Sequence, residues 1–296
     1  MTSPGKLLAC PLCNCSATPN VRLTLNGYSL RTCPECTFTW AEEVATGIHA
    51  QADYANYGDG YVSESKVDYA KNWIKFSTLR RQELANIRQA GSGEKTLLLD
   101  LGAGTGFFVA FCRSKGIDAY GVEPSETLRR FAASHFGVEL FPSLAALQQT
   151  CGSKLFDVIT SHDVLEHIDA FNLPEHLADI HHNLRNGGYF IGNTPNIESL
   201  NVRINGANDP VVTPPHHCLY FSPSTLEHLL SKNGFSKVQL KTAGISALLF
   251  PDASSSLAAK ASLFLQKAVF HSVWPLLKPF VPDRGYQIFF TFQKSS

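Results

Sequence analysis

The stretch 97–108, LLLDLGAGTGFF, decides the fold of this chain. It joins a run of apolar residues, which predicts a buried strand carrying Asp100, to the glycines Gly102, Gly104 and Gly106 and then to the start of a helix. Glycines at such a turn allow the backbone to pass close to a ligand and to enter the helix without clashes at Cβ. The dinucleotide spacing G-x-G-x-x-G is absent, because counting from Gly102 places a phenylalanine at its last position. We therefore expect a nucleotide-like ligand without a pyrophosphate.

Apolar runs and helical segments alternate along the chain on the C-terminal side of this loop, which indicates βαβ units and a parallel sheet. The next strand ends in Glu123, where an acid can accept hydrogen bonds from two ribose hydroxyls. Two later β-prone runs would complete a seven-stranded sheet, so we predict an α/β fold. Six of the seven predicted strands have assigned ranges, which are residues 96–101, 118–122, 155–160, 188–193, 236–241 and 286–293.

The strand, the glycine loop and the acid together resemble the class I S-adenosylmethionine-dependent methyltransferases, and the resemblance covers roughly residues 55–295. Three further segments resemble the branch that contains ubiquinone-type O-methyltransferases and sugar C-methyltransferases. They are FDVITSHDVLEHI at 156–168, LRNGGYFIGNTPN at 184–196 and HHCLYFSPSTLEHLLSKNGF at 216–235. The resemblance implies a seven-stranded Rossmann-like methyltransferase sheet.

The resemblance also implies which residues bind the cofactor, S-adenosylmethionine. Asp100 and the glycine loop would surround its methionine part, Glu123 its ribose, and residues near 141–144 its adenine. The expected set is Asp100, Gly102, Ala103, Gly104, Gly106, Glu123 and Ser161.

The loops after the fourth and fifth strands are expected to form the acceptor site, because open α/β sheets bind ligands at the carboxyl ends of their strands. Methyl transfer is an in-line displacement that needs a base only when the acceptor must lose a proton. An imidazole suits that role near neutral pH. The candidate catalytic residues are His162, Asp163, His167, His216 and His217. A purely structural role stays open for each histidine.

The spacing D-x-x-E-H would place Asp163, Glu166 and His167 on one face of a helical turn. Two carboxylates and an imidazole suit a hard or borderline divalent cation, which would lower the pKa of an acceptor hydroxyl. The ubiquinone-type O-methyltransferases have a similar acid-x-x-Glu-His segment implicated in divalent metal binding, although Asp163 is shorter than the Glu common there. These residues are therefore candidate ligands of a second divalent cation. The alternative is a Glu–His pair that only fixes the loop.

Residues 1–45 predict a zinc-ribbon module. Two Cys-x2-Cys pairs, separated by nineteen residues, have the spacing of two thiolate knuckles around one tetrahedral Zn²⁺. The predicted ligands are Cys10, Cys13, Cys33 and Cys36. The segment between the pairs predicts a β-hairpin that turns at Asn26-Gly27. Cys15 is a spare thiol, and the two-residue spacing favours Cys13 over it.

Composition limits the class of partner. Among 296 residues, 25 Lys and Arg balance 25 Asp and Glu, so no overall field directs the protein to nucleic acid. The zinc module is equally balanced, and we expect it to have a structural or substrate-covering role, as in the sugar C-methyltransferases that it resembles. A hydrophobic content of 44% excludes a disordered chain. The first residues lack the apolar core of a secretory signal, so we expect a cytoplasmic protein.

The predicted domains are the zinc ribbon at 1–45, a tyrosine-rich connector and helix at 46–92, and the methyltransferase domain at 93–296, which contains an apolar helical insertion at about 252–285. Within the insertion, the stretch 257–281 is amphipathic, with basic residues on one helical face and a wide apolar face opposite. Charged residues and prolines interrupt its apolar run, so it is not expected to span a membrane. Two interpretations stay open. The insertion packs on the sheet or at a homodimer interface, or it makes a peripheral membrane contact.

The sequence therefore predicts methyl transfer from S-adenosylmethionine to a small-molecule or lipid-linked acceptor. The set Asp163, Glu166 and His167 favours O-methylation, whereas the zinc module favours C-methylation of a nucleotide sugar. The alternative from a different class is a non-catalytic scaffold that binds the cofactor.

Overall fold

The computed structural model describes residues 9–25, 27–42, 84–85, 87–89, 96–243 and 284–295. The helix predicted within residues 46–92 enters this part only over 84–85 and 87–89, where the described residues are helical. The tyrosine-rich connector and the apolar stretch 257–281 lie outside the described residues. Within the part of the chain that is described, no helix combines the length and the apolar character needed to cross a bilayer.

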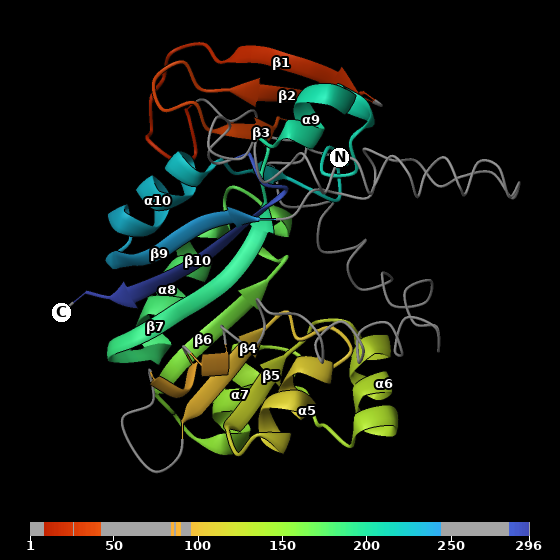
Figure 1. The fold of residues 1–296 in the computed structure, drawn as a ribbon, viewed down its shortest axis with the longest axis vertical. Helices are drawn as coiled ribbons and strands as arrows, with labels where there is room; N and C mark the ends of the chain where they lie inside the picture. Colours follow the sequence, from red (N-terminus) through yellow and green to blue (C-terminus); the bar gives the residue numbers. More distant parts are fainter. Residues whose placement is uncertain are drawn as a thin grey trace, which may run out of the picture.

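A six-stranded mixed sheet forms the main layer, in the order β5–β4–β6–β7–β10–β9 (Figure 1). The first four strands of this order are parallel, and β10 runs antiparallel to both of its neighbours. The strands are β4 (Leu97–Leu101), β5 (Asp118–Val122), β6 (Phe156–His162), β7 (Leu184–Pro195), β9 (Phe235–Ala243) and β10 (Gln287–Lys294). Each overlaps a strand predicted from the apolar runs.

The prediction of seven strands is wrong for the described residues. Phe141 makes only an isolated parallel bridge to Val122 beyond β5. Its N–H donates to the carbonyl of Gly121, and its carbonyl accepts from the N–H of Glu123. Ser143, the next residue whose backbone groups would face β5, instead caps the helix Leu144–Cys151, where its hydroxyl accepts from the N–H of Ala146, so the seventh strand stops after one bridge.

Helices connect the strands, and several begin at a serine cap. The Ser125 hydroxyl accepts from the N–H of Leu128 at the start of α6, and Ser222 forms a reciprocal pair of hydrogen bonds with Thr225 at the start of α10. The helices are α5 (Phe107–Ser114), α6 (Glu126–Phe136), α7 (Leu144–Cys151), α8 (Leu173–Asn183), α9 (Leu200–Asn205) and α10 (Pro223–Lys232), with 3-10 turns η1 (Leu165–His167) and η2 (Gly206–Asn208).

A second, four-stranded sheet joins the N-terminal module to the main domain. Its strands are β1 (Asn20–Leu25), β2 (Tyr28–Thr32), β3 (Thr39–Ala41) and β8 (Leu219–Tyr220), in that order. The hairpin predicted around Asn26-Gly27 is confirmed by the pairing of Leu25 with Tyr28. Figure 1 shows β1 to β3, in red, at the end of the molecule toward which β7 points. Because β8 belongs to the later sequence, the two parts share a sheet.

Candidate functional site

The glycine loop leaves β4 and enters α5 with one packed side and one open side. A Cβ at Gly102 would overlap Val164, and a Cβ at Gly106 would lie 2.7 Å from Ala132 Cβ, so both positions are tightly packed. Gly104 has a φ of +53° and no atom within 4 Å of the Cβ position. The loop therefore leaves space for a ligand on the side of Gly104.

Two buried acids lie beside the loop, and one of them, Glu123, bonds to it. Glu123, at the end of β5, accepts hydrogen bonds from the N–H groups of Gly104 at 2.9 Å and Ser125 at 2.8 Å. Burial raises the pKa of Glu123, although these two N–H groups act in the opposite direction. Asp100, in β4, accepts from the hydroxyl of Thr160 at 2.7 Å and lies 3.6 Å from Nδ1 of His162.

A cavity of about 610 Å³ lies beside the glycine loop, at the carboxyl ends of β4, β5 and β6. One wall is mainly apolar and is lined by Leu101, Gly102, Val122, Pro124, Pro142, Ser143, Leu144, Val164, His167 and Ile168. The other wall is polar and is lined by Asp169, Asn172, Glu175, His176 and Asp179. Gly102 and three residues predicted near the adenine, Pro142, Ser143 and Leu144, border this cavity. The other predicted cofactor residues are not in its lining: Asp100, Ala103, Gly104, Gly106, Glu123 and Ser161, the last of which is buried in β6.

A carboxyl group and two imidazoles meet next to this cavity. Glu166, His167 and His217, here called the acid–histidine cluster, each offer a ligand atom, and these atoms lie within 4.8 Å of one another. Glu166 is buried, and one of its oxygens accepts from the hydroxyl of Thr194 at 2.9 Å. Its other oxygen, Oε1, has no hydrogen-bond partner. Burial, and then the charge of Asp163, raise the pKa of Glu166 well above its ordinary value.

The two histidines of the cluster present the same nitrogen to it. Nδ1 of His167 donates to the carbonyl of His216, and Nδ1 of His217 donates to the carbonyl of Val211, both at 2.7 Å. A carbonyl only accepts, so the neutral rings carry their lone pairs on Nε2. Burial lowers the pKa of both rings, to about 4 for His217. Both are therefore neutral at pH 7, the form that ligates metals or accepts a proton.

The structure places three other predicted residues outside this cluster. The helical turn expected to begin at Asp163 is wrong, because this residue has a φ of +53° and precedes the 3-10 turn η1. Its carboxylate instead accepts from the side-chain amides of Asn193 at 2.8 Å and Gln287 at 3.1 Å. The ring of His216 is exposed. The ring of His162, at the end of β6, packs edge-to-face with the ring of Phe108, with the two ring centroids 5.0 Å apart.

A family model described as a methyltransferase domain matches residues 76–240, which is more than half of the chain. The chain belongs to this methyltransferase family. A search of the curated proteins finds no match.

Solved methyltransferases share the fold. An S-adenosylmethionine-dependent methyltransferase from Thermotoga maritima is 20% identical, with a TM-score of 0.50 over 84% of this chain and 100% of that one. A chain from the complex of the Haloferax volcanii Trm112 activator with a methyltransferase is 13% identical, with a TM-score of 0.52 over 82% and 98%. The plantazolicin methyltransferase BamL, solved with S-adenosylhomocysteine, is 16% identical, with a TM-score of 0.50 over 86% and 98%. The protein is thus an S-adenosylmethionine-dependent methyltransferase of the Rossmann-like class.

The residues of this methyltransferase fit S-adenosylmethionine. The open side of Gly104 and the neighbouring cavity leave room for it. Each carboxylate oxygen of Glu123 accepts one N–H and keeps a second lone pair, which is what a ribose hydroxyl needs. The part of the apolar wall formed by Val122, Pro142 and Leu144 matches the faces of an adenine ring.

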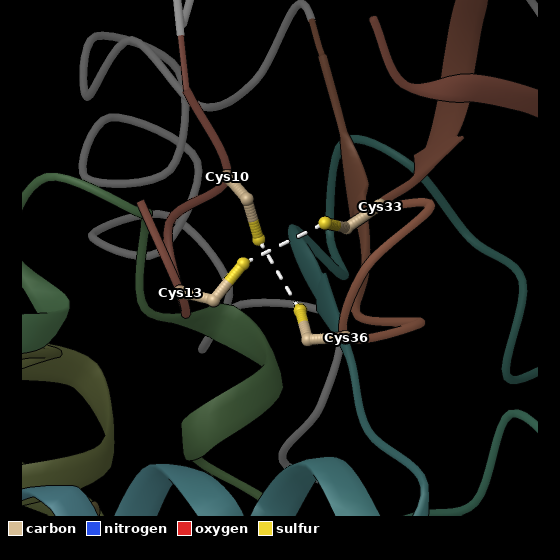
Figure 2. A group of neighbouring side chains, drawn as sticks. All are labelled: Cys10, Cys13, Cys33 and Cys36. Carbon is tan, nitrogen blue, oxygen red and sulfur yellow. Dashed lines mark hydrogen bonds between the residues drawn. The ribbon is translucent and has the colours of Figure 1, made fainter. Parts of the chain in front are cut away.

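Four cysteines form a second cluster of possible ligands in the methyltransferase, here called the cysteine cluster. Figure 2 shows the side chains of Cys10, Cys13, Cys33 and Cys36 pointing toward a common centre. The sulfurs of Cys10 and Cys36 lie 3.5 Å apart, and those of Cys13 and Cys33 lie 3.6 Å apart. The predicted choice of Cys13 over Cys15 agrees with this geometry, because the Cys15 sulfur instead accepts from the N–H of Ala17.

The two knuckles have the same backbone design. In each, the first cysteine accepts an N–H from the residue four positions later, Asn14 or Thr37, and both of these residues have positive φ. Each first cysteine also donates its own N–H to the carbonyl five positions later. Burial would raise the pKa of Cys33, but hydrogen bonds from the N–H groups of Cys36 and Glu35 lower it to about 7. The chemistry of four thiols suits Zn²⁺.

The polar wall of the cavity is what sequence reasoning missed. Asn172, Glu175, His176 and Asp179 come from α8 and the residue before it, at spacings of three and four. That spacing places them on one helical face, and this periodicity was the available signal. Thr194, which binds Glu166, carries no such signal because strand β7 brings it there from far along the chain.

Proposed function

We propose that this methyltransferase transfers the methyl group of S-adenosylmethionine to a hydroxyl oxygen of a small or lipid-linked acceptor. The observation that carries the proposal is the acid–histidine cluster at the carboxyl ends of the strands, beside the cavity. S-adenosylmethionine supplies an activated methyl on a sulfonium. The chain supplies orientation, exclusion of water and a place for the acceptor proton.

The proposed cofactor contacts follow the glycine loop. Asp100, Gly102, Ala103, Gly104 and Gly106 would hold the methionine part, and Glu123 the ribose hydroxyls. Pro142, Ser143 and Leu144 would contact the adenine in the cavity. Ser161 would act through the sheet beneath the site, because it is buried between β4 and β7.

The acid–histidine cluster would activate the acceptor hydroxyl. Its neutral imidazoles and its buried carboxyl form a set of one oxygen and two nitrogen ligands, which suits a borderline divalent cation. His217 would fill the ligand position predicted for Asp163. The oxygen of Glu166 without a partner supports this role, because a buried carboxyl oxygen needs a proton donor or a cation. Without a cation, His167 or His217 would accept the hydroxyl proton at Nε2.

We propose one Zn²⁺ at the cysteine cluster. Four thiolates fill a tetrahedral coordination sphere and leave no position for substrate, so this ion would be structural.

C-methylation of a nucleotide sugar is the second candidate. The packing of the cysteine module against β8 supports it, because a covering module then lies next to the proposed acceptor loops. The cytoplasmic location, the peripheral membrane contact through 257–281 and the homodimer remain predictions.

The cofactor is tested by thermal unfolding with and without S-adenosylhomocysteine. At about 100 times its dissociation constant, a ligand adds roughly 2.7 kcal/mol, which corresponds to roughly 5 to 10 °C in a domain of this size. The shift should disappear in Asp100→Ala and persist in Asp118→Ala, at the opposite end of the neighbouring strand. A shift that persists in both variants would contradict the proposed contacts.

The reaction is tested by incubating the zinc-loaded protein with labelled S-adenosylmethionine and a panel of phenols, catechols, lipid-linked quinols and nucleotide sugars. The position of the label in the product separates O- from C-methylation. Glu166→Gln and a chelator too weak to remove the zinc should both lower O-methyl transfer while cofactor binding persists. Full turnover in Glu166→Gln would remove the cluster from the mechanism.

A further inference from the structure

We infer that the cysteine module, residues 9–42, positions the acid–histidine cluster, so that the state of the cysteine cluster sets the geometry of acceptor activation. This inference rests on the proposed roles of the two clusters. In this arrangement β3 and Phe38, the residue before it, position the acid–histidine cluster for the reaction.

Cys218 bonds both to the cysteine module and to the acid–histidine cluster. Its carbonyl accepts a hydrogen bond from the N–H of Ala41, the last residue of β3, at 2.9 Å. Its own N–H donates to the carbonyl of Glu166 at 2.7 Å. His217 directly precedes it in the chain, and the carbonyl of His216 holds the ring of His167. A displacement of β3 would therefore act on all three members of the acid–histidine cluster.

The contact between β3 and β8 is buried and specific. Thr39 pairs with Tyr220 and Trp40 with Leu219 in an antiparallel ladder, and all four side chains are buried. Close-packed side chains have few alternative arrangements, so a contact of this kind transmits a change of position.

Phe38 adds a ring contact to this ladder. Its ring centroid lies 5.5 Å from that of Phe221, and both rings are fully buried. Phe38 directly precedes β3 in the chain.

The second cysteine knuckle directly precedes Phe38 and β3 in the chain and bonds to Phe38. The N–H of Cys33 donates to the carbonyl of Phe38 at 2.9 Å, so the fold of the knuckle fixes the residue that begins the packing against Phe221. The first knuckle is held from the other domain, because Nζ of Lys232 in α10 donates to the carbonyl of Leu12 at 2.8 Å. Hydrogen bonds and packed side chains therefore connect the second knuckle, through Phe38 and β3, to Cys218 beside the acid–histidine cluster.

The cofactor side does not share this path. The glycine loop bonds to β5 through the carbonyl of Val122 and the carboxylate of Glu123, and neither bond involves the module. Loss of metal from the cysteine cluster should therefore disturb acceptor activation and leave cofactor binding intact.

Histidine-ring NMR on the full-length protein tests the inference directly. Spectra are recorded with zinc bound, after zinc removal under reducing conditions, and after zinc is restored, and S-adenosylhomocysteine affinity is measured in each state. We expect the ring signals of His167 and His217 to move on zinc removal and to return with zinc. The signal of His135, on α6, and the S-adenosylhomocysteine affinity should stay unchanged.

A variant that leaves every cysteine in place makes the test independent of zinc. Phe38→Ala should move the His167 and His217 signals in the same way, Phe38→Leu should move them less, and Phe136→Ala, on α6, should leave them in place. Retained S-adenosylhomocysteine binding shows that the main sheet remains folded.

The outcomes separate this inference from the proposed function. If the protein binds no zinc but Phe38→Ala moves both signals, the zinc ligation is wrong and the positioning role stands. If zinc removal moves both signals and Phe38→Ala does not, the path through β3 is overturned. If neither treatment moves them, the module does not position the cluster.

Discussion

The cysteine cluster and the acid–histidine cluster differ in how their ligands are supplied and in what surrounds them. Each cysteine pair sits on one short knuckle whose own backbone hydrogen bonds aim the sulfurs. The acid–histidine cluster takes two residues from η1 and one from beyond position 215, and it keeps a buried oxygen without a partner. Four thiolates close a coordination sphere, whereas three ligands leave a position for water or substrate. With metal bound, the first arrangement would stabilise a fold, and the second would leave a position for chemistry.

The largest expected effect comes from breaking the cysteine cluster. Structural zinc contributes roughly 10 to 16 kcal/mol in small domains that depend on it, so Cys13→Ser should lose zinc and the folded state of the module. Zinc content by mass spectrometry and unfolding of the module, followed by amide hydrogen exchange in β1 to β3, measure the loss. Cys15→Ser is the matched control and should keep one zinc per chain. Equal zinc loss in both variants would mean that Cys15 is a ligand.

A half-buried histidine outside both clusters, His176, gives the second prediction. His176 lines the cavity, its Nε2 is buried without a hydrogen-bond partner, and burial lowers its pKa to about 4. The unfolded chain binds this proton below its ordinary pKa of 6.5, so the free energy of unfolding should fall between pH 6.5 and pH 4. The loss amounts to about 3 kcal/mol, at about 1.4 kcal/mol per pKa unit.

Urea unfolding at pH 7 and pH 4 measures this effect. His176→Gln should flatten the pH dependence by that amount, and a divalent cation should not alter the His176 contribution. Equal pH dependence in the wild type and His176→Gln would show that the ring is hydrated in solution.

The same differences explain which features could be predicted from the sequence and which could not. The glycine loop and the cysteine spacing predicted local geometry, because a few consecutive residues determine it, and the central strands followed from their apolar runs. Asp163 was misplaced because its positive φ depends on the amides of Asn193 and Gln287, which lie far along the chain. The sharing of a sheet between β3 and β8 depends on the whole topology, and no local pattern encodes it.

Glu166 gives the third prediction, which decides whether the acid–histidine cluster holds a cation. Without a cation, the raised pKa means that the folded state keeps a proton that the unfolded chain releases above pH 4.5, so stability should fall as the pH rises. Glu166→Gln keeps an acceptor for the hydroxyl of Thr194 and should lack this fall, so at pH 8 it should be more stable than the wild type.

Adding a divalent cation should make the wild type more stable than Glu166→Gln, which reverses the order expected without a cation. The wild type should then gain stability by mass action, and Glu166→Gln should not. Thermal unfolding with Mg²⁺, Mn²⁺ or Zn²⁺, after the cysteine cluster has been saturated with zinc, measures the difference. An equal response of both proteins would leave the cluster with a proton-transfer role only.

The smallest effect concerns an ion pair inside the cysteine module. Arg31, in β2, pairs with Glu42 after β3 at 2.7 Å, and their side chains are 21% and 15% exposed. Arg130 and Glu126 form a comparable pair on α6, at 79% and 65% exposure. Exposed pairs contribute about 0.5 kcal/mol or less, and a partly shielded pair contributes up to about 1 kcal/mol. Arg31→Gln should therefore speed zinc release to a chelator slightly, because it loosens β3 beside the second knuckle, whereas Arg130→Gln should leave the release rate unchanged. Equal rates in the two variants would mean that the knuckles hold zinc without help from the strands, and the cysteine cluster would then be independent of the sheet that it helps to build.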